Sequence, residues 1–143
     1  MKSIAVIYWS GTGNTKMMAE AIAEGAKNDE VMVTLMEVSS ASIEDLLNAD
    51  AVALGCPAMG DEVLEESEME PFVATIEKEG LNGKPVALFG SYGWGDGEWM
   101  IDWADRMKKA GAMLVDDGLI IQEAPDEQGL ESCRELGRRL AFM

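Results

Sequence analysis

The chain has 143 residues, 27 acidic against 11 basic residues, a net charge of −16 and no histidine. This length suits one domain over residues 1–143, and the charge argues against binding to nucleic acid or anionic membranes and for a cationic partner. Without histidine, the usual general base, metal ligand and nucleophile partner are missing, so any reaction would depend on a cofactor.

The start of the chain and its two cysteines favour a cytoplasmic protein. Lys2 precedes an apolar stretch of six residues, which is too short for a signal peptide or for the ~20 residues that cross a bilayer. Cys56 and Cys133 are too few and too far apart for a disulfide framework or a zinc site. We therefore expect both thiols in the core.

Apolar runs and helical patterns alternate along the chain. The runs predict strands over 3–9, 31–37, 50–56, 85–90 and 112–121. The intervening helical patterns extend from Met18 to Ala26, Ile43 to Leu47, Met69 to Ile76, Trp99 to Met107 and Cys133 to Leu140. Five such units with right-handed crossovers favour an α/β fold, a doubly wound five-stranded parallel sheet of order 2-1-3-4-5 with helices on both faces. Its ligand crevice would lie beyond the carboxyl ends of strands 1, 3 and 4.

The loop after the first strand is the most informative segment. It consists of Ser10, Gly11, Thr12, Gly13, Asn14 and Thr15. Hydroxyls, an amide and two glycines between a strand and a helix are suited to hold a phosphate through backbone N–H groups and the helix dipole. Because no Lys or Arg lies inside the loop, it favours one terminal phosphate monoester held without a metal.

Two better-known phosphate loops match these residues less well. A Walker loop fails because Lys16 and Met17 stand where its second glycine and its lysine belong. A dinucleotide fingerprint lacks its third glycine at Lys16, although Glu37 ends the next strand where a ribose-binding acid would lie. That fingerprint remains a minor alternative, as does an ordinary turn.

The loops after strands 3 and 4 carry flat or polarisable side chains beside glycines. Met59 and Trp94 could close on the two faces of a planar ring, while Gly60, Gly93 and Gly95 let backbone groups reach its polar edge. The plain alternative for Trp94 is an aromatic lid that packs on its own domain. A ring with a terminal phosphate describes FMN.

The whole chain resembles a flavodoxin of the short-chain, clostridial type. The motifs that carry this resemblance are Tyr8-Trp9-Ser10-Gly11-Thr12-Gly13-Asn14-Thr15, Leu54-Gly55-Cys56-Pro57-Ala58-Met59-Gly60-Asp61-Glu62 and Leu88-Phe89-Gly90-Ser91-Tyr92-Gly93-Trp94-Gly95. One departure is Lys16, because relatives commonly carry an acid there.

The resemblance implies roles for individual residues. The phosphate would be held by the side chains of Ser10, Thr12, Asn14, Thr15 and Ser91 and by the backbone of Gly11 and Gly13. Met59 and Trp94 would cover the isoalloxazine faces, Glu62 would hold the pyrimidine N3–H, and Gly93 and Gly95 would contact the N1/O2 edge. The expected site also includes Ala58, Gly60, Asp61 and Tyr92, and the Gly60–Asp61 peptide would flip on reduction.

Acidic residues flank the ring loops and predict the redox behaviour. They are Asp61, Glu62, Glu65, Glu66, Glu68, Glu70, Asp96 and Glu98. At ~12 Å and an effective dielectric of ~40, each carboxylate opposes an added negative charge by ~0.7 kcal/mol. We expect a low-potential carrier that moves one electron, mainly between the neutral semiquinone and the anionic hydroquinone of bound FMN.

Two other functions were considered. An FMN-dependent NAD(P)H quinone or azo reductase on the same fold is the main alternative, but it needs space over the ring and a basic grip on phosphates. A phosphate-sensing receiver domain needs an Asp at the end of strand 3, where Gly55-Cys56-Pro57 stands instead. We expect no enzyme but a monomeric carrier, whose partners would be ferredoxin-type donors and acceptors with basic docking patches.

Overall fold

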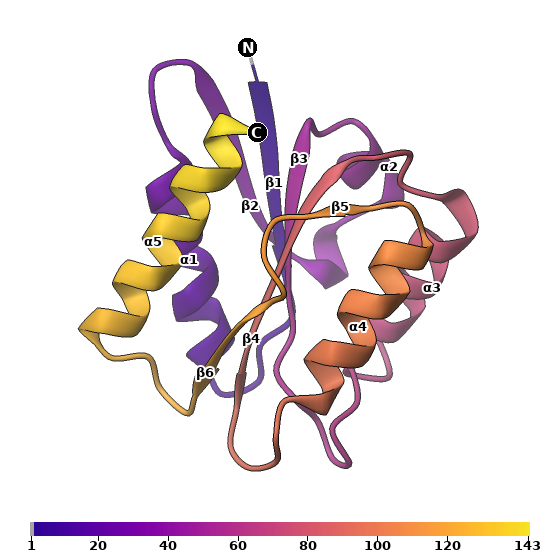
Figure 1. Cartoon of the computed structure of the whole chain (residues 1–143), viewed down its shortest axis with the longest axis vertical. Coiled ribbons are helices and arrows are strands. Elements are labelled where there is room, and N and C mark those ends of the chain that lie inside the picture. Colours follow the sequence, from indigo (N-terminus) through magenta and orange to yellow (C-terminus); the bar gives the residue numbers. More distant parts are fainter. Residues whose placement is uncertain (1) are drawn as a thin grey trace.

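The computed structural model describes residues 2–143 and places one sheet between two helical layers (Figure 1). In chain order the elements are β1 (Lys2–Tyr8), α1 (Asn14–Ala26), β2 (Val31–Glu37), a 3₁₀ turn (Val38–Ser40), α2 (Ile43–Leu47), β3 (Ala51–Gly55), α3 (Met69–Glu79), β4 (Pro85–Tyr92), α4 (Glu98–Lys109), β5 (Met113–Leu114), β6 (Leu119–Gln122) and α5 (Glu127–Phe142). All described strand pairs are parallel, and the order β2-β1-β3-β4-β5 confirms the predicted topology.

The fifth strand is not continuous, which corrects the predicted strand over 112–121. β5 and β6 pair with opposite ends of β4, and the segment between them leaves the sheet. Asp116 and Gly118 have φ of 85° and 113°, values that a strand cannot contain. The Asp116 carboxylate is held by the Arg139 guanidinium on α5 at 3.1 Å. The apolar pattern marked the two ends of this strand but not the break.

β4 is longer than the predicted strand over 85–90, because it runs on to Tyr92. Ser91 and Tyr92 therefore belong to the sheet and pair with Ile121 and Gln122 of β6. The segment after β3 lies beside the end of β4, because the Ala58 N–H donates to the Ser91 carbonyl at 3.0 Å. The loop after β3 is thus joined to the end of β4 by a backbone hydrogen bond.

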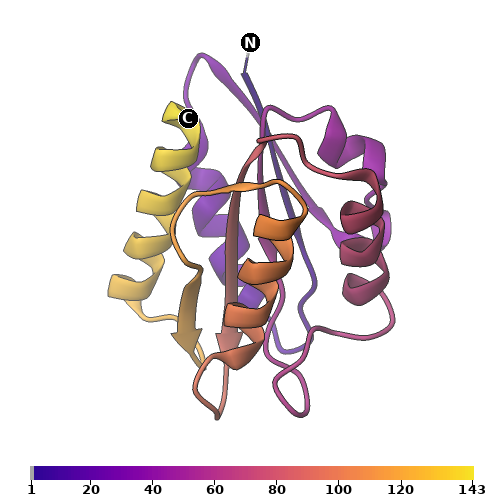
Figure 2. The same ribbon diagram turned by 45° about the vertical axis from the view of Figure 1, so that its right-hand side comes forward.

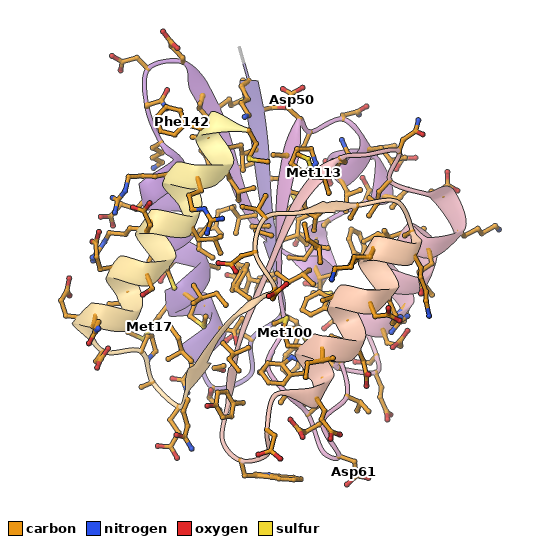
Figure 3. All side chains as sticks on the ribbon, in the orientation of Figure 1. Met17, Asp50, Asp61, Met100, Met113 and Phe142 are labelled. Carbon is orange, nitrogen blue, oxygen red and sulfur yellow. The ribbon has the colours of Figure 1, made fainter. Side chains whose placement is uncertain are left out.

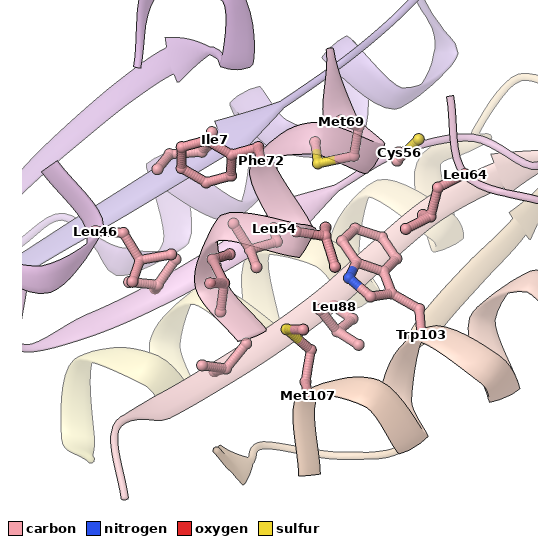
Figure 4. Close-up of a cluster of buried hydrophobic side chains, with 14 of the residues drawn as sticks. Ile7, Leu46, Leu54, Cys56, Leu64, Met69, Phe72, Leu88, Trp103 and Met107 are labelled. Atoms are coloured by element: carbon pink, nitrogen blue, oxygen red, sulfur yellow. The ribbon is translucent and has the colours of Figure 1, made fainter. Parts of the chain in front are cut away.

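The helices lie in two layers, one on each face of the sheet (Figure 2). A separate apolar core holds each layer on the sheet. One lies under α2, α3 and α4 and includes Leu54, Leu88 and Trp103; the close-up in Figure 4 shows this cluster. The other lies under α1 and α5, where Phe89 and Ile22 are fully buried. Full burial of such side chains stabilises the fold by ~1.5–3 kcal/mol each. Both helical layers are therefore fixed relative to the strand ends that carry the loops.

Two glycines allow α1 and α5 to touch through their backbones. A Cβ at Gly25 would lie 2.0 Å from the Arg134 carbonyl oxygen, and one at Gly137 would lie 2.1 Å from the Ile22 carbonyl oxygen. Any side chain at either position would push the helices apart. This contact fixes α1, and with it the loop that precedes α1.

Both cysteines are free and buried, as predicted. Burial raises the pKa of the Cys56 and Cys133 thiols to about 12, so neither is a reactive thiolate near neutral pH. None of the helices over residues 2–143 is long and apolar enough to cross a membrane.

The two ends of the chain lie at the same end of the molecule (Figure 1). The Lys2 ammonium donates to the Ala141 carbonyl in the last turn of α5 at 3.3 Å and also bonds the Met143 carbonyl. This end is opposite the loops that follow β1, β3 and β4.

Candidate functional site

The three predicted loops meet in a cleft of about 270 Å³ at the carboxyl edge of the sheet. Figure 3 shows Asp61 at this end of the molecule and Asp50 at the other. The cleft is lined by Trp9, Gly11, Thr12, Asn14, Pro57, Ala58, Met59, Ser91, Tyr92, Gly93 and Glu123. Eight of these eleven residues belong to the site expected from the sequence.

The loop before α1 is shaped to leave donors unpaired. The Ser10 hydroxyl oxygen accepts from the N–H groups of Gly13 at 3.1 Å and Lys16 at 3.3 Å, and Gly13 takes a φ of 100°. Four other N–H groups at this point have no acceptor within residues 2–143; they belong to Gly11, Thr12, Asn14 and Thr15. Unpaired N–H groups at a helix start are the donors that bind phosphate oxygens in proteins.

Two hydroxyls lie beneath this loop. The side chains of Thr15 and Ser91 are 1% and 5% exposed, and their oxygens are 3.0 Å apart. The Ser91 N–H also donates to the Thr15 oxygen at 3.4 Å. One of the two hydroxyl hydrogens is used within the pair, so the other is available to a ligand. The pair also ties α1 to β4 under the cleft.

A tight turn follows the cleft wall formed by Ala58 and Met59. Met59 and Val63 exchange two backbone hydrogen bonds of 3.0 Å each, which closes the turn. Gly60 has a φ of 47°, and a Cβ added there would contact nothing within 4 Å. The backbone conformation, rather than lack of space, therefore favours glycine at this position.

Several expected site residues lie outside the cleft. Trp94 is 66% exposed and does not line it, so it does not pack on its own domain as the lid alternative requires. Gly60 and Asp61 lie around a neighbouring hollow next to Met59. The phosphate loop is held in shape by Ser10, Gly13 and Thr15, which do not line the cleft themselves. Outside the cleft, Glu62 lies against Gly95. The structure thus brings the phosphate loop and the Met59 wall together and leaves Trp94 at the rim.

Three cleft residues are absent from the expected site. They are Trp9, Pro57 and Glu123. The Trp9 indole N–H donates to Glu68 at 3.1 Å, and a Cβ at Gly11 would lie 3.1 Å from the Trp9 ring. Because Trp9 directly precedes the phosphate loop, its position in the sequence could have identified it as a cleft residue. No sequence pattern identified Glu123 as a cleft residue. It reaches the cleft because the backbone after β6 takes a φ of 58° at this position.

One acid near the ring loops is not a free surface charge. Glu65 is 6% exposed, and its carboxylate accepts from the N–H groups of Ser67, Glu68 and Met69 at 2.8 to 3.0 Å and from the Ser67 hydroxyl. Burial raises the pKa of the Glu65 carboxyl, but these hydrogen bonds outweigh it and hold the pKa below its usual range. Glu65 therefore caps α3 and is not a solvated surface charge. Lys16, in contrast, is exposed.

Comparison with known proteins gives the family. The family model for flavodoxin matches residues 6–137. A flavodoxin from Clostridium beijerinckii is 52% identical over 95% of this chain and 97% of its own length. The chain belongs to the short-chain flavodoxin family. Flavodoxins bind FMN and carry electrons between redox partners, and the close relatives are named as carriers rather than enzymes.

Solved flavodoxin structures agree with this assignment. The two-electron reduced flavodoxin of Megasphaera elsdenii has a TM-score of 0.87 and 42% identity, and the match covers 98% of this chain and 99% of that one. A flavodoxin from the domain Archaea has a TM-score of 0.89 and 34% identity, covering 98% of this chain and 96% of that one. The flavodoxin fold predicted from the sequence is confirmed.

The residues present suit FMN. The unpaired N–H groups of Gly11, Thr12, Asn14 and Thr15 offer donors for a terminal phosphate, with no cation in the lining. The rest of the cleft is walled by the Met59, Tyr92 and Trp9 side chains, which suit the less polar ring system. The cleft therefore has a polar end and an apolar end, as FMN has.

Proposed function

We propose that this flavodoxin carries single electrons at low potential with non-covalently bound FMN, mainly between the neutral semiquinone and the anionic hydroquinone. The observation that carries the proposal is the lining of the cleft. It contains one carboxylate, that of Glu123, and no cationic side chain. A site without cations and with carboxylates nearby disfavours an added negative charge, and this lowers the potential of the second electron.

The proposed roles of the chain follow its geometry. The N–H groups of Gly11, Thr12, Asn14 and Thr15 and the free hydroxyl hydrogen of the Thr15–Ser91 pair would bind the phosphate. Met59 would exclude water from one face of the ring, and the Trp94 side chain would rotate to cover the other without a change in its loop. The Gly60 carbonyl oxygen would accept a hydrogen bond from the N–H group that the ring gains on reduction. FMN supplies the electron-accepting chemistry, and the chain fixes its charge environment.

The reductase alternative has no support here. It needs a basic grip for a pyridine nucleotide, whereas none of the residues that line the cleft within 2–143 is Lys or Arg. Charge repulsion by the surrounding acids would oppose binding of a second phosphorylated cofactor.

Anaerobic photoreduction of the FMN-loaded protein tests the proposed function. The blue neutral radical should accumulate to a large fraction at half reduction, and the second potential should be well below the first. Direct conversion to the two-electron reduced form, with no blue intermediate and with oxidation of added NADH, would support the reductase instead.

The net charge of −16 also supports docking of partners through basic patches. Surface fields of this size accelerate encounter by ~10- to 1000-fold and are screened over ~10 Å at 0.1 M salt. Electron transfer to a cationic acceptor should therefore slow steeply between low and high salt in stopped-flow traces. Rates that do not change with salt would show that docking is not electrostatic. A monomer in the cytoplasm stays a prediction.

A further inference from the structure

The Glu62 side chain joins two loops that are far apart in the sequence. Its carboxylate accepts from the N–H groups of Gly97 at 2.9 Å, Glu98 at 3.0 Å and Asp96 at 3.4 Å. These are the N–H groups at the start of α4, whose N-cap residue is Gly97 and has no side chain to cap with. The cap of α4 is therefore supplied by a residue 35 positions upstream.

Gly95 gives an independent indication of the same contact. A Cβ at Gly95 would lie 2.5 Å from the Glu62 carboxylate carbon, so any side chain there would displace the carboxylate. The two residues also have φ of 95° and 57°, and the second value is unusual for a residue with a side chain. The backbone of both loops is bent to bring this carboxylate to α4.

We propose that Glu62 is a positioning residue, whose carboxylate holds the turn 59–63 and the loop 93–97 together as one unit. An ionised carboxylate is stabilised by the helix dipole and by charge-assisted hydrogen bonds. Without them, Glu62 would be repelled by its neighbours Asp96 and Glu98, because all three are acids. The contact fixes the loop that carries Trp94 relative to Met59.

The two carboxylate oxygens of Glu62 accept different numbers of hydrogen bonds. Oε1 accepts from Gly97 and Glu98, whereas Oε2 accepts from Asp96 at the long distance of 3.4 Å. Oε2 thus keeps capacity for one more donor. In this respect the inference rests on the proposed FMN site: a ring N–H bound at Oε2 and the cap at Oε1 can exist together, so the ring would meet two loops that are already aligned.

Amide hydrogen exchange by NMR tests the inference on the FMN-loaded full chain. In Glu62→Ala the Gly97 and Glu98 amides should exchange about tenfold faster than in wild type, as expected for the loss of a helix cap. The matched control is Glu66→Gln, because Glu66 is exposed, carries the same charge and takes no hydrogen bond within residues 2–143. That variant should exchange at the wild-type rate. Equal rates in Glu62→Ala and wild type would overturn the inference.

A second measurement separates this inference from the FMN site itself. The faster exchange in Glu62→Ala should persist in chains freed of FMN, where a lost bond to the ring cannot contribute. Failure of wild type to bind FMN would reject the proposed function and leave this result standing. Faster exchange in the loaded chain alone would mean that Glu62 acts through the ring and not through α4.

Gly95→Ala provides a further check through a double-mutant cycle. Its added Cβ should speed the Gly97 exchange in wild type by displacing Glu62, and should speed it less when Glu62 is already Ala. Strain at φ 95° is common to both backgrounds and cancels. Strictly additive effects would show that Gly95 is needed for its backbone alone.

Discussion

The helices α1 and α4 start with the same backbone conformation, but the free N–H groups at their N-termini differ in their hydrogen-bond partners. Each helix follows a left-handed glycine, Gly13 with φ of 100° and Gly97 with φ of 86°, and neither glycine has a capping side chain. At α4 the carboxylate of Glu62 occupies the free N–H groups. At α1 no carboxylate of the described chain does so. Whether a helix start can bind an anion is therefore decided by what the rest of the fold brings to it.

α3 resembles α4 in this comparison. The buried carboxylate of Glu65 caps its start, so two of the three helices that start beside the cleft are closed by acids of the chain itself. The open helix start is the one that the Ser10–Thr15 loop surrounds. Three experiments can break or sharpen this contrast.

The largest expected effect concerns the open start of α1. FMN should bind the apoprotein at least ~100-fold more tightly than riboflavin, because two or more charge-assisted hydrogen bonds of ~1.5–3 kcal/mol each depend on the phosphate. Thr15→Ala should reduce this preference, since it removes one of the buried hydroxyls beneath the loop. Titration calorimetry with both flavins measures it. Equal affinity for FMN and riboflavin would show that this loop does not bind the phosphate.

The closed start of α3 should respond to pH. The pKa of Glu65 is lowered on folding, so its contribution to stability is present above the unfolded pKa of ~4.3 and is lost as pH falls through the folded value. At pH 7, Glu65→Gln should lower the free energy of unfolding by ~2 kcal/mol, because it leaves buried donors poorly paired. Urea unfolding at fixed FMN concentration measures it.

The control for this experiment is again the exposed neighbour. Glu66→Gln should change stability by less than ~0.5 kcal/mol at every pH. The difference between wild type and Glu65→Gln should shrink in acid. A difference that is constant from pH 7 to pH 3 would mean that the charge of Glu65 does not stabilise α3.

The smallest effect is expected from Lys16, near the open start of α1. Lys16→Glu should weaken FMN binding by about 2- to 10-fold at low salt, as is typical of one exposed charge at a helix end, and the effect should fade at 0.5 M salt. Lys27→Glu makes the same charge change beyond the other end of α1 and should leave the affinity unaltered. Identical losses in the two variants would assign the effect to net charge alone.

The sequence predicted the sheet order and the three loops at its carboxyl edge because both follow from local patterns. Apolar runs and glycine-rich turns can be recognised within a few residues. The break between β5 and β6 could not be predicted in this way, because it depends on the Asp116 backbone and its pairing with Arg139. An apolar run in the sequence therefore indicates where a strand lies, but not where contacts with a distant helix interrupt it.

The same limit applies within the candidate site. Glu62 and Glu65 stand in a run of acids that looks uniformly solvated, yet each caps a helix through contacts that the spacing does not reveal. Trp94 is 66% exposed, and its expected place over the ring stays a prediction. Residues whose role depends on a distant loop, or on a ligand, were the ones that the sequence could not place.

The common position of the two chain ends, opposite the cleft, has a practical consequence. A tether attached through Lys2 or Met143 would leave the loops around the cleft facing outward (Figure 1). On an electrode, molecules fixed at either end would thus present the same face to an approaching redox partner in solution. Attachment at either of these two residues would therefore give an immobilised film whose clefts face the solution.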